Sequence, residues 1–179
     1  MPEYPDPESM HSGDHDTRIA KARLQTFRWL AARPRSEREI RRKLYDKGYT
    51  ESVIDKVVTG LYESAYLDDG VFARQWARNL AVNRRLGNRR IEMSLLEKGI
   101  SKENIHEVLE ELRQETPELK VIRDLIRRKT GGRPFNHLTG QEKARIIRSL
   151  YGKGFSSDSI RDAMDQPMED NFFSDNDRK

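Results

Sequence analysis

The sequence predicts an all-α protein in which three tandem three-helix repeat units form an elongated, curved array. Hydrophobic residues recur at helical spacing, and the alternating pattern of a strand is almost absent. One pattern occurs three times, as IRRKLYDKGYT at 40–50, IEMSLLEKGIS at 91–101 and IIRSLYGKGFS at 146–156. Hydrophobic residues make up 35% and charged residues 36% of the chain, which suits thin modules that stabilise one another better than one large globule.

The first copy of the pattern has the signals of a helix, a tight turn and a second helix. Ser36 and Glu39 form a capping box that starts a helix. Ile40 and Leu44 lie one turn apart on its inner face. Gly48 follows where a helix ends in the left-handed conformation, because glycine adopts it without a steric penalty. A second helix then begins after a capping Thr50, with an apolar stripe of Ile54, Val57, Val58 and Leu61.

The other two copies repeat this logic, and a further amphipathic helix precedes each copy. Gly99 and Gly154 take the place of Gly48, and Ser101 and Ser156 take the place of the capping Thr50. In the third copy, Thr139 makes a capping box with Glu142. The predicted organisation is therefore an acidic disordered segment (1–16), three repeats (17–66, 67–116 and 117–165) and an acidic disordered tail (166–179).

Charge is distributed unevenly along the chain. The net charge is +4. Residues 1–16 contain five acids and no Lys or Arg, and residues 165–179 contain five acids against two basic residues, so residues 17–164 carry +12. A basic body between acidic ends favours a polyanionic partner or an acidic protein surface.

Within the predicted repeats the charge sorts by helix position. The first helices (17–35, 69–86 and 118–129) carry +6, +3 and +3, and the third helices (51–64, 102–115 and 157–165) carry −2, −3 and −2. The helix–turn–helix pattern resembles a DNA-reading motif, but in that motif the helix after the turn enters the major groove. An acidic helix would be repelled there, so the pattern favours sequence-independent contact with phosphates or with an acidic protein groove.

The densest basic cluster is RRLGNRR at 84–90, where arginines end one helix and open the next. Arginine at a helix start opposes the helix dipole, which indicates a binding role, although a solvated corner is an equally good interpretation. REIRRK at 38–43 and IRRK at 126–129 are weaker candidates. The predicted basic face consists of Arg84, Arg85, Arg89, Arg90, Arg41, Arg42, Lys98, Arg127, Arg128, Lys143, Arg145 and Arg148.

The sequence favours no catalytic, cofactor or metal site. The chain has no cysteine, which excludes disulfides and thiolate chemistry. Asp68 and Asp69 follow YL and precede a helix, so we expect an N-cap and an acid that favours the helix dipole rather than a magnesium pair. His11 and His15 flank Asp14, but they lie in the segment predicted to be disordered, which disfavours a metal site there. His106 and His137 lack a partner at the spacing of metal ligands or catalytic groups. No apolar stretch is long enough to span a membrane and no secretory signal pattern is present, so a cytoplasmic protein is expected.

Taken together, these motifs resemble the RecX family of bacterial regulators of the RecA recombinase. The matching stretches are SEREIRRKLYDKGY, YLDDGVFARQWARN and RRLGNRRIEMSLLEKGIS, with a looser match in VIRDLIRRK and EKARIIRSLYGKGF. Where the family usually has Gly-Pro, this chain has Gly87-Asn88, and Asn88 can cap a helix.

The resemblance implies a non-enzymatic protein, a monomer without a cofactor, that binds in the groove of a RecA filament on single-stranded DNA. It implies modulation, usually inhibition, of filament growth, ATP hydrolysis and strand exchange in DNA repair, recombination and the SOS response. It also implies weaker, phosphate-mediated binding of single- and double-stranded DNA. The alternatives from other classes are a general sequence-independent DNA-binding protein and a hydrolase or nuclease, the latter disfavoured by the missing constellation of catalytic groups.

Overall fold

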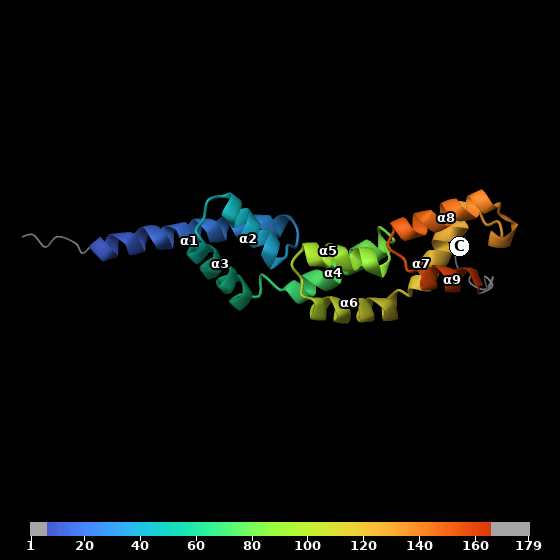
Figure 1. Ribbon diagram of the computed structural model, residues 1–179. Coiled ribbons are helices and arrows are strands. Elements are labelled where there is room, and N and C mark those ends of the chain that lie inside the picture. The colour runs from blue at the N-terminus through green and yellow to red at the C-terminus, as the bar shows by residue number, and fades with distance from the viewer. Residues whose placement is uncertain (1–6, 166–179) are drawn as a thin grey trace, which may run out of the picture. The chain divides into compact units, whose positions relative to one another are not determined.

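The computed structural model of the chain describes the backbone of residues 7–165 and the side chains of residues 14–165. All its regular elements are helical, which confirms the predicted fold class (Figure 1). The elements are α1 (Pro7–Ala32), α2 (Glu37–Asp46), α3 (Glu51–Glu63), α4 (Asp69–Val82), α5 (Asn88–Glu97), α6 (Lys102–Glu115), α7 (Glu118–Thr130), the 3₁₀ turn η1 (Phe135–His137), α8 (Gly140–Gly152) and α9 (Ser157–Asp165).

The described chain is divided into two compact units. The N-terminal unit contains residues up to 76 together with 94–106, and the C-terminal unit contains 77–93 together with the residues from 107 onward. The core of the N-terminal unit is formed by α1, α2 and α3 and includes Ile40, Leu44, Ile54 and Leu61, all almost fully buried. The core of the C-terminal unit is formed by α7, α8 and α9 and includes Ile122, Ile126, Leu150 and Phe155.

The helix starts follow the predicted capping chemistry. The Ser36 hydroxyl accepts from the Glu39 amide, and the Glu39 carboxylate accepts from the Ser36 amide, so the capping box of α2 is confirmed. Thr139 and Glu142 form the second predicted box at α8. Ser101 and Ser156 accept the amide hydrogens of Asn104 and Ser159. Thr50 lies at the cap of α3 without a side-chain hydrogen bond.

The three Lys-Gly turns end α2, α5 and α8 in the left-handed conformation predicted for them. Gly48, Gly99 and Gly154 have φ angles of +80°, +85° and +88°. In each turn, the amide after the glycine donates to the carbonyl of the leucine five residues earlier, at 3.2, 3.1 and 3.3 Å. These turns therefore give all three repeats the same local exit from the second helix.

Two predictions about local structure are wrong. Helix α1 begins at Pro7, so it includes residues 7–16 of the segment predicted to be disordered; proline suits the first turn of a helix, and acids near that end favour the helix dipole. Asn88 is the first residue of α5 and not its cap, because the Gly87 carbonyl accepts the amides of Arg90 and Ile91. The predicted tail at 166–179 lies outside the described residues.

Candidate functional site

The basic cluster of residues 84–90 forms the corner between α4 and α5, within the C-terminal unit. Arg84, Arg89 and Arg90 are exposed, and Arg85 is half-buried. Arg85 also has a φ angle of +51°, in the left-handed region that residues other than glycine rarely occupy. Such backbone strain concentrates at functional sites, where the surrounding structure maintains it.

Contacts with the Lys-Gly turn of the third repeat hold this corner in place. The Gly87 amide donates to the Lys153 carbonyl at 2.9 Å, and the Lys153 ammonium donates to the Arg84 carbonyl at 3.0 Å. Arg90 donates through Nη1 to the Gly152 carbonyl at 3.1 Å. A Cβ atom at position 87 would lie 2.5 Å from the Gly154 carbonyl oxygen, so only glycine fits there. The fold thus brings Lys153 to the arginine corner.

The carboxylate of Glu118, which contacts this corner through Asn88, already accepts hydrogen bonds from within the chain. Glu118, at the start of α7, accepts the Asn88 amide at 2.9 Å and the Ser159 hydroxyl at 2.9 Å. Arg113 lies 3.7 Å from the same carboxylate and donates to the Asn88 side chain at 2.6 Å. Glu118 therefore serves the packing of α5, α6, α7 and α9.

The corner concentrates positive charge that the described residues do not neutralise. Partial burial lowers the pKa of Lys153, and the charges of Lys129, Arg85 and Arg90 lower it further. Within residues 14–165, no carboxylate forms an ion pair with these four side chains or with Arg84 and Arg89. We call this set the basic corner: Arg84, Arg85, Arg89, Arg90, Lys129 and Lys153.

In the corresponding turn of the N-terminal unit, at residues 98–99, a carboxylate neutralises the lysine. Lys98 lies 2.9 Å from the Glu39 carboxylate, and Arg33 lies 2.8 Å from the same oxygen. Lys98 also lies 5.0 Å from the ring centre of Trp76. Burial opposes ionisation of Glu39, but hydrogen bonds from Arg33 and Lys98 outweigh it and hold its pKa at about 2. Lys98 thus stabilises the packing of this unit through its ion pair with Glu39.

The remaining residues of the predicted basic face differ in how many carboxylate or carbonyl partners they already have within the chain. Arg41 contacts three carboxylates, those of Glu37 (2.6 Å), Glu51 (3.1 Å) and Asp55 (2.7 Å). Arg127 lies 3.7 Å from Asp124. Lys143 is half-buried and donates to the Asn136 carbonyl. The residues that are exposed and have no carboxylate partner within 14–165 are Arg42, Arg128, Arg145 and Arg148.

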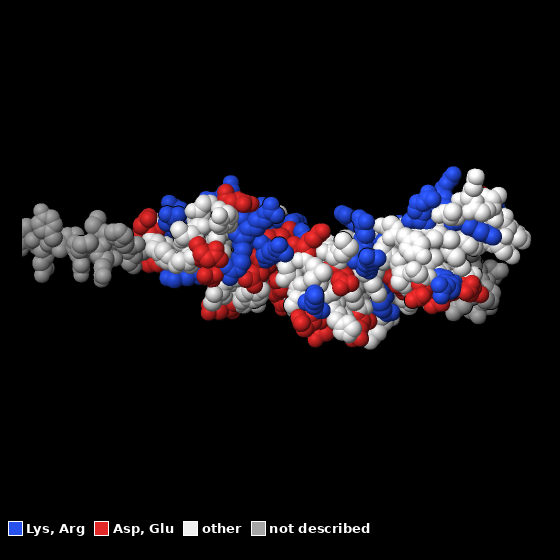
Figure 2. Space-filling model, in the orientation of Figure 1, with Lys and Arg blue, Asp and Glu red and all other residues white. Residues whose placement is uncertain are grey.

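On the face shown in Figure 2, Lys and Arg side chains of the C-terminal unit project from α8 along one edge, while Asp and Glu side chains gather over α9 on the opposite edge. The acidic third helix of this repeat is therefore separated from the basic second helix within the unit. In the N-terminal unit, basic and acidic side chains are interspersed on the same face.

Lys153 and Lys129 are not among the twelve residues of the predicted basic face, although Lys129 belongs to the weaker candidate IRRK at 126–129. The hydrogen bond from the Lys153 ammonium to the Arg84 carbonyl joins residues 69 positions apart, so no local pattern indicates it. The repeated Lys-Gly pattern contained the signal, because Lys98 and Lys153 occupy the same place in two copies.

Asp68 has the capping role expected of it, whereas Asp69 lies in the first turn of α4 and its carboxylate binds the start of α2. Asp68 accepts the Val71 amide at 2.8 Å and caps α4, and Asp69 accepts the Glu37 amide at 2.8 Å. Among the described residues, no group of three or more His, Asp or Glu side chains has the arrangement of a metal site. No helix in this part of the chain has the length and apolar character needed to cross a membrane.

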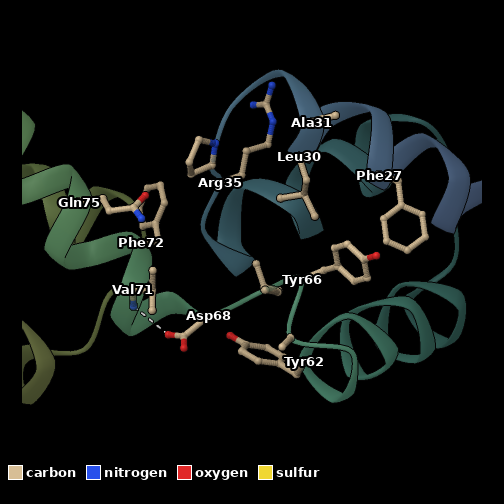
Figure 3. A pocket seen from close by; sticks show the side chains of 13 residues that line it. Phe27, Leu30, Ala31, Arg35, Tyr62, Tyr66, Asp68, Val71, Phe72 and Gln75 are labelled. Carbon is tan, nitrogen blue, oxygen red and sulfur yellow. Dashed lines mark hydrogen bonds between the residues drawn. The ribbon is translucent and has the colours of Figure 1, made fainter.

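A separate apolar cleft of about 1020 Å³ lies in the N-terminal unit (Figure 3). Aromatic side chains from α1, α3 and α4 border it, with Phe27 and Tyr66 packed edge to face at 4.8 Å between ring centres. Its lining includes Arg35 but none of the twelve residues of the predicted basic face. The cleft and the basic corner are therefore distinct features.

These features define a class: a helical-repeat protein with three consecutive three-helix modules, whose distinctive surface is an unneutralised basic corner. Three family models match in order along the chain, and they describe the first (residues 22–61), second (68–109) and third (117–164) three-helix domains of RecX. The chain belongs to the RecX family of regulatory proteins.

Individual relatives agree with the family models. The chain is 30% identical over 172 residues to the regulatory protein RecX of Mycobacterium sp. strain JLS, covering 92% of this chain and 93% of the relative. It is 29% identical to that of Mycolicibacterium smegmatis, covering 88% and 85%. A crystal structure of regulatory protein RecX shares the fold with a TM-score of 0.77 at 21% identity over 91% of this chain and 81% of that one. RecX from Lactobacillus salivarius gives 0.73 at 22% identity, covering 83% and 96%.

Proposed function

We propose that this chain regulates a RecA recombinase by binding in the groove of the filament that RecA forms on single-stranded DNA. Binding there limits filament growth, ATP hydrolysis and strand exchange in recombination and DNA repair. The protein acts without catalysis, in the cytoplasm and as a monomer, with weaker phosphate-mediated contact to single- and double-stranded DNA. Its family membership supports this proposal.

The observation that carries the proposal is the basic corner. Six cations lie at one junction of the C-terminal unit, and no carboxylate within residues 14–165 pairs with them. Like charges held together without internal partners lower stability unless a partner or solvent screens them. A filament with acidic groove walls and DNA phosphates supplies the opposite charge over a long surface.

Repetition explains how weak contacts can regulate a filament. We place the exposed cations of other helices, including Arg42, Arg128, Arg145 and Arg148, on the same binding face. Linked contacts raise the overall affinity by roughly 10²–10⁴ when they can be made together. A protein bound across adjacent recombinase subunits blocks the next subunit or bridges those present, and either effect changes filament dynamics.

The test adds the purified protein to preformed recombinase filaments and follows ATP hydrolysis and DNA occupancy together. The informative variant reverses two exposed arginines of the corner, Arg84→Glu and Arg89→Glu. The matched control reverses two exposed lysines on acidic third helices, Lys56→Glu and Lys102→Glu, with the same change in net charge. We expect the corner variant to lose at least about tenfold in filament affinity and the control to lose less than about threefold. Unchanged regulation by the corner variant at low salt would refute the proposal.

A general DNA-binding role is the second candidate, and the exposed arginines of the corner favour it as well. Oligonucleotide affinity measured with and without recombinase separates the two. If the affinity is the same in both cases and falls steeply with salt, general DNA binding is the better description. A regulator of the filament instead binds the assembled filament more tightly than either the DNA or the recombinase alone.

A further inference from the structure

Two junctions in this chain follow a common plan that is offset by one residue: Arg38, two residues before Ile40, contacts the first turn, and Arg90, one residue before Ile91, contacts the second. In the first junction, the Lys-Gly turn of 98–99 packs on the start of α2, where Arg38 donates to the Leu96 carbonyl at 3.3 Å. In the second junction, the Lys-Gly turn of 153–154 packs on the start of α5, where Arg90 donates to the Gly152 carbonyl at 3.1 Å. A Cβ atom on Gly99 would lie 2.8 Å from the Cβ of Arg38, and one on Gly154 would lie 2.6 Å from the Cβ of Arg90.

The repeat register shows one decisive exchange between them. Ile40 and Ile91 are equivalent, since each is the buried aliphatic residue that starts the repeated pattern. The residue before each of them is Glu39 in the first junction and Arg90 in the second. Lys98 and Lys153 are equivalent as well. In the sequence register, the carboxylate that neutralises Lys98 is therefore replaced by a guanidinium, and this guanidinium contacts the turn of 153–154 as Arg38 contacts the turn of 98–99.

This exchange leaves the second junction with a surplus of cations. In the first junction, Glu39 joins Lys98 and Arg33 in one ion-pair network. In the second, Arg85, Arg90 and Lys129 lie close enough to Lys153 to disfavour its charge. A junction selected only for stability would keep the carboxylate, and local violations of this kind occur where a chain binds something.

We propose that the second junction is a phosphate-binding site, in which Arg85, Arg90, Lys129 and Lys153 surround one backbone phosphate of a nucleic-acid strand. The proposal deepens the proposed function, on which it rests, by assigning the anion that this part of the binding face meets. Guanidinium and ammonium groups suit the oxygens of a phosphate, and no base contact is needed.

A nucleic-acid strand fits the corner better than a protein carboxylate does. Arg84 and Arg89 are exposed beside the four residues of the site, so the cations cover more than one anion position. A strand carries one negative charge about every 3.4 Å, and it can therefore supply neighbouring phosphates to neighbouring cations. An isolated carboxylate would neutralise only one of them.

The decisive variant is Arg90→Glu, which places a carboxylate at the position of the repeat that Glu39 occupies in the first junction. Its Cβ atom remains beside Gly154, and its carboxylate adds a negative charge close to Lys153. We expect binding of a fluorescent oligothymidylate, without recombinase, to weaken at least about tenfold in moderate salt, with a shallower dependence of affinity on salt. We expect the thermal midpoint to change little, because the relief of charge repulsion around Lys153 offsets the lost hydrogen bond to the Gly152 carbonyl.

Two controls make the result interpretable. Lys56→Glu changes the net charge equally but lies on α3, and it should weaken oligothymidylate binding less than about twofold. Arg90→Gln removes the charge without adding a carboxylate, and it should fall between the wild-type protein and Arg90→Glu. If Arg90→Glu does not fold, the oligothymidylate affinity of Arg90→Gln tests the site by itself.

Three outcomes would overturn the site. The first is unchanged oligothymidylate affinity in both Arg90 variants, and the second is equal weakening by Lys56→Glu. The third is an Arg90→Glu variant that keeps its affinity for oligothymidylate but loses binding to recombinase alone or to polyglutamate. That outcome would assign the corner to protein carboxylates and would leave the proposed regulation of the filament intact. The two proposals can also be separated with both variants. If Arg84→Glu with Arg89→Glu loses regulation of the filament while Arg90→Glu keeps its oligothymidylate affinity, the proposed function stands and the phosphate site does not.

Discussion

Glu39 shows how much one residue of the repeat contributes. Its carboxylate accepts from the Ser36 amide in the capping box, and it also pairs with Arg33 and Lys98. The side chain is only 17% exposed. The same group therefore starts α2 and holds the turn of residues 98–99 to it.

Substituting Glu39 should reveal this role as a pH-dependent loss of stability. Because the folded pKa is about 2, below the ordinary 4.5, ionised Glu39 stabilises the fold above pH 4.5, and this contribution is lost as the pH falls towards 2. We expect Glu39→Gln to lower the free energy of unfolding by about 1 kcal/mol at pH 7, allowing for solvent screening. Urea denaturation at pH 7 and at pH 2.5 measures the difference. A difference of the same size at both pH values would contradict this role.

Gly154 should be more sensitive to substitution than Gly48, although both are left-handed. An added Cβ at Gly154 would lie 2.6 Å from the Arg90 amide nitrogen, whereas one at Gly48 would have no atom within 4 Å. Gly48→Ala should therefore cost only the backbone strain, about 1 kcal/mol, and Gly154→Ala should cost about 2–4 kcal/mol because the junction must also open. Chemical denaturation of the two variants provides the comparison. Equal losses would mean that the second junction is not packed as described.

At the scale of the elements, local signals were predictable and contacts between distant elements were not. The capping boxes at Ser36 and Thr139 and the three left-handed glycines follow from residue types a few positions apart. The Lys98–Glu39 pair joins residues 59 positions apart, and the hydrogen bond from Lys153 to the Arg84 carbonyl joins residues 69 apart. Only the packing of one repeat's turn on the preceding repeat's helix brings these groups together. The sequence therefore predicted the arginines of the corner and included Lys129 only in the weaker candidate IRRK, and it did not indicate that Lys153 lies beside them.

The acidic third helices should remain outside the binding face. Arg161 on α9 is exposed, but Asp158 lies 3.8 Å from it and Asp162 is its neighbour in sequence. We expect Arg161→Ala to change oligonucleotide affinity less than about twofold, because an exposed pair of this kind contributes little to a phosphate contact. Arg89→Ala on α5 should reduce the affinity about three- to tenfold. Fluorescence anisotropy on oligonucleotides of different sequence tests both variants. An equal loss in Arg161→Ala, or a change in its sequence preference, would place α9 on the nucleic acid.

At the scale of the whole molecule, the three repeats share a pattern but not a charge balance. Their Lys-Gly turns have the same backbone, yet the turn of 98–99 is neutralised by Glu39 and the turn of 153–154 is surrounded by cations. Arg41, in the first repeat, is likewise satisfied by Glu37, Glu51 and Asp55. Repetition thus preserves the architecture, while a single exchange at one position of the repeat changes the charge of the junction.

Combining charge reversals from the two units tests whether the whole chain engages the filament. Arg42→Glu, on α2, should weaken filament binding about threefold, since Arg42 is exposed and has no ion pair within residues 14–165. Arg84→Glu with Arg89→Glu should weaken it at least about tenfold. Because the sites lie in different units, their free energies should add, so the triple variant should bind about thirtyfold more weakly. Occupancy of recombinase filaments measured against protein concentration gives all three affinities. A triple variant no weaker than the double variant would show that the filament meets the C-terminal unit alone.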